Sequence, residues 1–275
     1  MKPDDADLPT PAGARAVHAW ALREGQPAQA THETVIDEEP VALEVNGIAH
    51  TVMLATPLDL EDFALGFLLT EGLIDDAADL LDVETQKSDI GTVLRLQITA
   101  RREAGFKERR RSLAGRTGCG LCGVENLEQL ALPVPRVAEG LRLPLSALTR
   151  AMAGLLARQP LQHLTGAVHA AAWCSADGTP VLVREDVGRH NALDKLVGAL
   201  ARSRTDAAGG FVVVTSRASF EMVQKAARAG VGLLAAVSAP TLRAIALAEE
   251  AGLTLAGFVR DQRATVYTHP ERLRG

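Results

Sequence analysis

The sequence has few aromatic residues and few cysteines. Phe, Trp and Tyr make up 3% of its 275 residues, which argues against the aromatic platforms on which proteins stack single-stranded bases. Three cysteines are too few for a disulfide framework. A formal net charge of −5 argues against a general nucleic-acid binder, since such a protein neutralises phosphates with Lys and Arg. We therefore expect no nucleic-acid partner.

The sequence also lacks the apolar segments that export or anchor a protein. No run approaches the ~18 apolar residues of a membrane span. Residues Met1–Asp5 place acids and a proline where a signal peptide needs an apolar core. We expect a cytoplasmic protein with no membrane partner.

Two of the three cysteines lie in one glycine-rich motif, Thr117-Gly118-Cys119-Gly120-Leu121-Cys122-Gly123. Glycines suit a loop that is mobile or that a ligand approaches closely. The preceding segment 101–116 is basic, with seven Lys or Arg against two Glu. Such a positive field lowers the pKa of a nearby thiol and attracts anions.

The residues of this motif leave three interpretations open. A structural zinc site usually needs four ligands, and the chain offers one Cys-x-x-Cys and no well-spaced His pair. A thioredoxin-like redox site would begin a helix after a strand. A sulfur carrier needs a nucleophilic thiolate on a loop that can move between the sulfur donor and the acceptor, and a second thiol can aid release of the sulfur. The third cysteine, Cys174, follows Trp173 in an apolar stretch, so we expect it to be buried and inert.

The first half of the chain predicts an α+β unit after a mobile start. We expect residues 1–32 to be mobile, with order beginning near Thr34, and a unit over 33–135 that contains the cysteine loop (100–125). Its expected elements are a hairpin of strands 41–45 and 48–54 around Asn46-Gly47, a helix from Asp59 to Gly72, and a strand over 94–98.

The second half predicts an α/β domain over 136–275. Its expected elements are a helix capped by Ser146, a hairpin of 168–173 and 181–183, a helix over 191–202, strands over 211–215, 233–237 and 253–259, a helix over 220–229, and a helix from Pro240 to Gly252. Continuous apolar strands that alternate with helices predict parallel strands covered on both faces.

Polar residues follow each strand of this β-α-β-α-β pattern. They are Ser216 and Arg217 after the first strand, Ser238 after the second, and Arg260, Asp261, Gln262 and Arg263 after the third. In parallel sheets, ligands bind beyond the carboxyl ends of the strands. Arg and helix N-termini favour anions, so we expect a ligand that carries phosphate.

Another dense polar cluster is Glu185-Asp186-Val187-Gly188-Arg189-His190-Asn191. It leads into an expected helix and fits either a satisfied capping network or a ligand clamp that includes Arg189 and His190. His169 follows an apolar dipeptide, so we interpret it as a hydrogen-bonded core residue.

Several long motifs resemble one known family, FdhD, the formate dehydrogenase accessory sulfurtransferases. They occur in the family's order from about residue 33 to the end: Phe63-Ala64-Leu65-Gly66-Phe67-Leu68-Leu69-Thr70-Glu71-Gly72, the cysteine motif, Glu185 to Lys195, Ser216-Arg217 with Glu221-Met222-Val223, Ala235 to Thr241, and Gly257-Phe258-Val259-Arg260.

The resemblance implies a role, partners and site residues. It implies a cytoplasmic homodimer that receives sulfur from a cysteine desulfurase. The sulfur passes to the molybdenum or tungsten cofactor with two molybdopterin guanine dinucleotides, which formate dehydrogenase then uses. By the same resemblance Cys119 is the persulfide carrier and Cys122 assists. The cofactor-contacting segment corresponds to Phe258, Val259, Arg260, Asp261, Gln262 and Arg263, for which GDP would be a mimic.

The resemblance also implies a cytidine-deaminase-like fold, that is, a three-layer C-terminal domain with a mixed, largely parallel sheet. Deaminases need His-x-Glu and Pro-Cys-x-x-Cys to hold zinc. Here His169-Ala170-Ala171 lacks the glutamate, and the cysteine pair lies earlier in the chain without the proline. We expect no zinc and no deaminase activity. One departure from the family pattern is Thr215-Ser216-Arg217, where members commonly have a glycine before the arginine.

The sequence as a whole therefore predicts a sulfurtransferase that uses Cys119 and holds its acceptor with Arg217, Arg260 and Arg263. A non-catalytic chaperone that binds the cofactor and docks on formate dehydrogenase is the alternative. A zinc-stapled adaptor ranks third.

Overall fold

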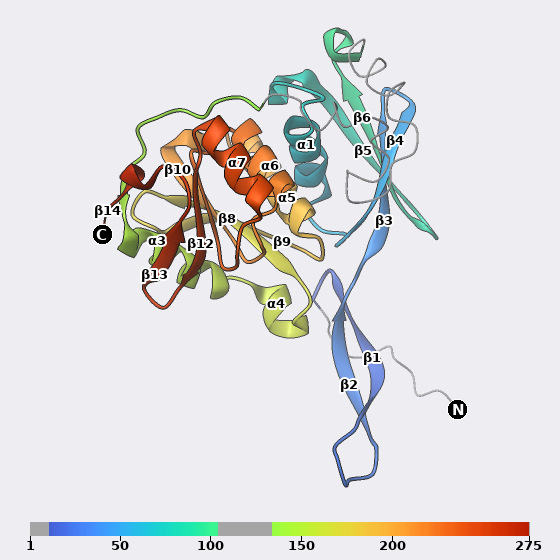
Figure 1. Cartoon of the computed structure of the whole chain (residues 1–275). Coiled ribbons are helices and arrows are strands. Elements are labelled where there is room, and N and C mark those ends of the chain that lie inside the picture. Colours follow the sequence, from blue (N-terminus) through green and yellow to red (C-terminus); the bar gives the residue numbers. More distant parts are fainter. Residues whose placement is uncertain (1–10, 104–133, 275) are drawn as a thin grey trace.

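A computed structural model describes residues 11–103 and 134–274. The described chain begins with a hairpin of β1 (Ala14–Ala21) and β2 (Gln29–Ile36), which projects from the body as an arm (Figure 1). The expectation that order begins near Thr34 is therefore wrong. The alternating pattern of a half-buried strand is weak here because most side chains of both strands are at least partly exposed.

The next unit is a four-stranded sheet covered by one helix. Its strands, in the order β4-β3-β6-β5, are β3 (Glu39–Val45), β4 (Ile48–Ala55), β5 (Leu80–Ser88) and β6 (Gly91–Ile98). The predicted hairpin is confirmed: Asn46 and Gly47 both have positive φ, as the tight turn between twisted strands requires. Strands β3 and β6 are parallel, and the other pairs are antiparallel.

Helix α1 (Leu60–Thr70) packs on this sheet through Phe63, Ala64, Phe67 and Leu68, which contact the inward residues of β3 and β6. The helix begins after Asp59 as predicted. The side chain of Asp59 makes no capping hydrogen bond, however, and its backbone is left-handed. A short 3-10 turn, η1 (Ala77–Asp79), leads into β5.

The second unit is a six-stranded mixed sheet in the order β13-β12-β11-β10-β8-β9. Strands β10 (Gly210–Val214), β11 (Leu233–Ala236) and β12 (Thr254–Arg260) are parallel, which confirms the predicted β-α-β-α-β pattern. Strands β8 (His169–Ser175), β9 (Pro180–Asp186) and β13 (Arg263–Val266) add to it in antiparallel fashion.

Helices cover both faces of this sheet, so the unit has three layers (Figure 1). One face packs against α5 (Arg189–Arg202), α6 (Phe220–Arg228) and α7 (Leu242–Ala251). The other packs against α3 (Leu145–Leu156). Short elements complete the unit: α4 (Pro160–Thr165), η3 (Ala207–Gly209), η4 (Pro270–Arg272), and the pair β7 (Leu143–Pro144) and β14 (Leu273–Arg274). The layers agree with the expectation; the cytidine-deaminase-like likeness remains a prediction.

Two helix starts differ from the sequence expectation. Ser146 lies inside α3, which begins one residue earlier, after Pro144. Pro240 lies before α7, and the Thr241 side chain caps this helix by accepting from the Ala244 N–H at 3.2 Å. A threonine hydroxyl at the N-cap satisfies a free backbone donor, which proline at the first turn does not do.

The two units meet through α1 and α5, whose backbones touch. Cys174 is completely buried, and burial raises the pKa of its thiol to about 12, which confirms the expected burial. Across 11–103 and 134–274, no helix is long and apolar enough to cross a membrane.

Candidate functional site

The candidate site is the edge of the six-stranded sheet at which β10, β11 and β12 end. Because β8 runs antiparallel to β10, it begins at this edge with His169, and β9 ends there with Asp186. The loops after the parallel strands lie side by side. The Ala218 N–H donates to Ala239 O at 3.3 Å, and the Phe258 N–H donates to Ser238 O at 3.3 Å. The predicted segments are therefore brought together.

The first loop holds a buried serine next to an exposed arginine. Ser216 is 4% exposed, and its Oγ donates to the backbone carbonyl of Arg217 at 3.0 Å. Arg217 is exposed, and among the described side chains it has no ion-pair or hydrogen-bond partner. The serine stabilises the loop, whereas the arginine is available to an anion.

The third predicted segment forms the tip of the β12–β13 hairpin. Arg260 and Arg263 pair across a two-residue turn of Asp261 and Gln262, both of which have positive φ. All four residues are exposed, and neither arginine forms an ion pair with any residue that the structure describes. Two guanidiniums thus lie at the tip of the β12–β13 hairpin.

Phe258 and Val259 differ in their exposure. The β12–β13 register shifts between Gly257 and Arg260, and Phe258 has a φ of 54°. Phe258 is 38% exposed, whereas Val259 is 0% exposed and packs in the core on the α3 side. A bulge re-aims side chains in this way. Of the two predicted residues, Phe258 is accessible to a ligand and the side chain of Val259 is not.

The polar cluster that begins at Glu185 is largely a structural network. Asp186 accepts from Thr56 N at 3.1 Å, Gly188 N at 2.7 Å and Asn191 Nδ2 at 3.0 Å, and it pairs with Lys195 Nζ at 2.7 Å. Both Asp186 and Lys195 are 0% exposed. These residues fit the capping interpretation, because their hydrogen-bonding groups are satisfied within the chain.

Glu185 belongs to the same network. Its carboxylate accepts from the backbone N–H groups of Leu161 and Gln162 at 3.1 and 2.9 Å, at the start of α4. The free N–H groups of a helix start are thereby satisfied.

Arg189 and His190 do not belong to that network. They form the first turn of α5. His190 Nε2 lies 2.9 Å from Glu221 Oε2 in the first turn of α6, and Ser219 Oγ donates to the same carboxylate oxygen at 3.2 Å. Arg189 Nε is buried and has no hydrogen-bond partner in the described chain. The clamp interpretation therefore fits these two residues.

Burial by itself raises the pKa of Glu221. The hydrogen bond and charge of His190, the Ser219 hydroxyl and the charge of Arg189 outweigh this effect and lower the pKa below its ordinary value. Glu221 is therefore ionised at neutral pH.

His169 was interpreted from the sequence as a hydrogen-bonded core residue, and the structure places it at this edge. Ala171 and Trp173 face α5 and α6, so the alternation of the strand puts His169 on that side as well. Its ring makes no hydrogen bond within the described residues. Burial, and then the charges of Arg189 and His190, lower its pKa. Sequence reasoning also omitted Glu221 as a site residue; both are visible only once α5, α6 and β8 are brought together.

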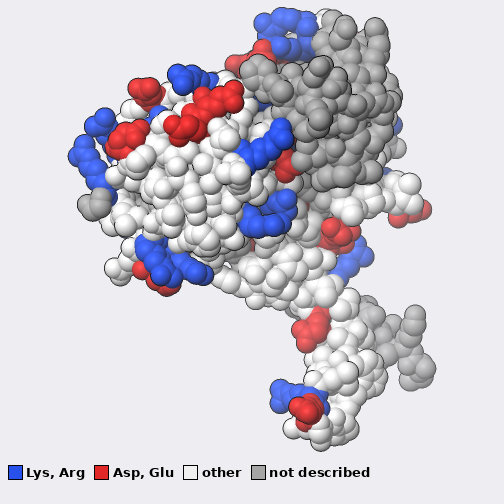
Figure 2. Space-filling view, viewed as in Figure 1, with Lys and Arg blue, Asp and Glu red and all other residues white. Residues whose placement is uncertain are grey.

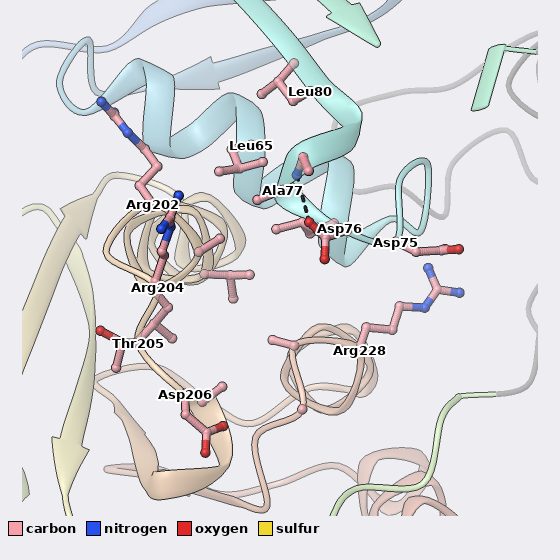
Figure 3. Close-up of a pocket in the computed structure, with 18 of the residues that line it drawn as sticks. Leu65, Asp75, Asp76, Ala77, Leu80, Arg202, Arg204, Thr205, Asp206 and Arg228 are labelled. Atoms are coloured by element: carbon pink, nitrogen blue, oxygen red, sulfur yellow. Dashed lines mark hydrogen bonds between the residues drawn. The ribbon is translucent and has the colours of Figure 1, made fainter. Parts of the chain in front are cut away.

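A separate cleft of about 1150 Å³ lies at the opposite end of the strands (Figure 3). It is lined by residues that precede β10 and β11, such as Asp206 and Gly230, and by Leu65 and Leu69 of α1. Its rim carries both signs of charge, including Arg204, Arg228 and Asp75. None of the predicted site residues that the structure describes lines it.

The predicted catalytic pair, Cys119 and Cys122, lies outside the described residues. No group of three or more His, Cys, Asp or Glu residues that could hold a metal occurs within 11–103 and 134–274. The zinc interpretation of the cysteine motif is not tested by this observation.

Comparison with known proteins places the chain in a family. The model of the FdhD/NarQ family matches residues 36–274. The chain is 56% identical to the sulfur carrier protein FdhD of Variovorax paradoxus over 275 residues, which is 100% of this chain and 96% of that protein. It is 55% identical to the protein of the same name from Bordetella petrii over 242 residues, 88% of this chain and 87% of that one.

A solved structure is similar throughout. It is the crystal structure of a proposed formate dehydrogenase accessory protein from Desulfotalea psychrophila, 26% identical, with a TM-score of 0.75 over 95% of this chain and 99% of that chain. With a family model that covers most of the chain and relatives more than half identical to it, this protein belongs to the FdhD/NarQ family.

Proposed function

We propose that this protein carries sulfur as a persulfide on Cys119 and delivers it to a molybdenum or tungsten cofactor bearing two molybdopterin guanine dinucleotides, in support of formate dehydrogenase. Relatives of 55–56% identity are named sulfur carrier proteins. The glycine-flanked cysteine pair with its basic approach provides the chemistry that such a carrier needs.

The loading step requires only thiol chemistry. The Cys119 thiolate attacks the outer sulfur of a persulfide on a cysteine desulfurase. A new S–S bond forms at Cys119, the S–S bond on the donor breaks, and the donor cysteine leaves as a thiolate, so the step involves no net oxidation or reduction. Cys122, three positions further along the chain, supplies a second thiol that assists release.

The observation that supports an acceptor of this class is the group of arginines at the sheet edge. Arg189, Arg217, Arg260 and Arg263 have no ion-pair partner among the described residues, while Glu221 pairs with His190. Unpaired guanidiniums bind phosphate oxygens in fork geometry. The exposed ring of Phe258 offers an aromatic face for a guanine base. A dinucleotide presents both groups.

Mass spectrometry tests the carrier role. After incubation with a cysteine desulfurase and free cysteine, we expect one added sulfur on the peptide that contains Cys119, lost again when the cofactor is added. The Cys174 peptide is the internal control, since that thiol is buried. If neither Cys119 nor Cys122 gains sulfur although the protein still binds GDP, the carrier role is wrong and the chaperone alternative is favoured.

Complementation separates the same two functions in the cell. A bacterial strain that lacks its native version of this protein should have no formate dehydrogenase activity when it produces the Cys119→Ala variant, although the variant protein is still made. Full activity in that variant would be incompatible with a persulfide on Cys119.

A further inference from the structure

Arg243, in the first turn of α7, is a further arginine at the sheet edge where β10, β11 and β12 end. Helix α7 follows β11, so its first residues lie beyond the carboxyl end of that strand. The loop before α7 is tied to the loop that holds Arg217. The Thr241 N–H donates to Ala218 O at 3.1 Å, and Ala218 forms a bridge with Pro240. Arg243 therefore begins at the same edge as the arginines described above.

The guanidinium of Arg243 lies over an aromatic ring and not beside a carboxylate. Its Cζ is 4.6 Å from the ring centroid of Phe220, the first residue of α6. Cation–π attraction holds an arginine on the face of such a ring. The acid next to that ring in sequence, Glu221, pairs with His190 at 2.9 Å. Among the described residues, the Arg243 side chain has no ion-pair or hydrogen-bond partner.

The acids of α7 are too far along the helix to neutralise Arg243. An acidic partner on the same helix would stand three or four residues away, where the chain has Ala246 and Leu247. Glu249 and Glu250 lie in the last turn of α7. Figure 2 shows an acidic patch in the upper part of the body, towards the end of α7 and not towards its beginning.

We propose that Arg243 binds a phosphate group of the acceptor, so that α7 contributes to the site together with the loops after β10 and β12. This inference rests on the proposed function, because it takes the ligand to contain a nucleoside diphosphate. The chain has a formal net charge of −5, so arginines without partners at one edge are a local feature. Like charges gathered there repel each other, and a polyanion removes this repulsion.

Phe220 acts as a positioning residue for this contact. A guanidinium that already lies on a ring loses less side-chain freedom on binding than a free one does. The edge of the guanidinium still presents N–H donors in the fork that fits phosphate oxygens. Phe220 thus contacts Arg243, and Arg243 contacts the phosphate.

Calorimetric titration of the full chain with GDP and with inorganic pyrophosphate tests the proposal. Arg243→Ala should raise both dissociation constants by about five- to thirtyfold, because it removes one charge-assisted contact. The loss should be similar for the two probes, and the remaining affinity should depend less on salt. Arg243→Lys keeps the charge without the planar fork and should fall between the two. The control is Arg204→Ala, at the opposite end of the strands, which should bind like the wild type.

Phe220→Leu separates positioning from a purely structural contact. It removes the ring and leaves the charge of Arg243, so we expect about two- to fivefold weaker binding of pyrophosphate with the salt dependence of the wild type. A cation–π pair that only joins α6 to α7 predicts a different result. Arg243→Ala and Phe220→Leu would then lower the melting temperature and leave both dissociation constants unchanged.

The outcomes distinguish this inference from the proposed function. If the wild type binds both probes and Arg243→Ala binds them equally well, only the role of Arg243 is wrong. If Arg243→Ala loses affinity for GDP but not for pyrophosphate, its contact is not with phosphate and the proposal is overturned. A wild type that binds neither probe overturns the phosphate-bearing acceptor of the proposed function as well.

Discussion

Gly66 of α1 lies directly against the backbone of α5 at Asp194. A Cβ added to Gly66 would come within 1.7 Å of the Asp194 carbonyl oxygen. The contact is reciprocal, because a Cβ on Gly198 of α5 would lie 1.9 Å from the carbonyl oxygen of Asp62 in α1. These two glycines let the helices that join the two units approach more closely than any side chain would permit.

Gly66→Ala and Gly198→Ala should therefore each destabilise the protein. The methyl group has no space unless the helices separate, so we expect the free energy of unfolding to fall by about 1–3 kcal/mol. Equilibrium urea denaturation measures it. Gly232→Ala is the matched control, since its nearest neighbour would be 3.5 Å from the new Cβ. Equal stability of Gly66→Ala and the control would contradict the close contact.

Lys195→Met should remove a buried ion pair. It leaves the Asp186 carboxylate, 0% exposed, without its cation and leaves Thr56 O without its donor. Breaking a buried pair on one side costs about 3–5 kcal/mol, which thermal or denaturant unfolding can measure. Glu84→Gln removes an exposed pair with Arg95 and should cost less than about 1 kcal/mol. If both variants lose the same free energy of unfolding, the buried pair contributes no more to stability than the exposed pair.

Arg217→Ala and Arg260→Ala should weaken GDP binding. Each removes a charge-assisted contact, so we expect a tenfold to hundredfold increase in the dissociation constant by calorimetry, about 1.4–3 kcal/mol. Binding by the wild type should also weaken as salt is added. Arg204→Ala is the control, because Arg204 lines the cleft at the opposite end of the strands. If only Arg204→Ala loses affinity for GDP, the nucleotide binds in that cleft and not at the sheet edge.

The ring of His169 should titrate below 6.5, as measured by NMR. Burial lowers its pKa first, and the charges of Arg189 and His190 lower it further. A histidine with a lowered pKa binds its proton more readily in the unfolded state, so its contribution to stability is lost as the pH falls through and below about 6.5. The acid-dependent loss between pH 7.5 and 5.5 should be smaller in His169→Asn. An identical loss in that variant would assign the effect to other groups.

Local patterns explain which parts of the fold could be predicted. The dipeptide Asn46-Gly47 predicts a tight turn by itself, because both residues readily adopt positive φ. The strands that end at Val214 and Ala236 are each recognisable from a short run of apolar residues. The rule that parallel strands end at one edge then brought Arg217 and Arg260 together. Ion pairs between distant segments could not be predicted in this way. Lys195 and Thr56 are 139 residues apart, and no local pattern marks either as the other's partner.

The arm was missed for a different reason. Most of its side chains are at least partly exposed, so its strands lack the strict alternation that marks a half-buried strand. His169 was misread because its strand is apolar and its charged neighbours come from α5. The burial of Val259 beside the exposed Phe258 depends on a bulge that composition does not reveal.

The joining of α1 to α5 also sets an order of events during synthesis. Helix α1 leaves the ribosome more than 100 residues before α5, the helix that covers it. Thr56 is likewise synthesised more than 100 residues before its hydrogen-bond partners Asp186 and Lys195. Until then the side of α1 turned away from the four-stranded sheet lacks α5, and contacts this distant in sequence close slowly. We therefore expect the nascent first half to be exposed to aggregation, and slowing translation between residues 70 and 189 should lengthen that exposure.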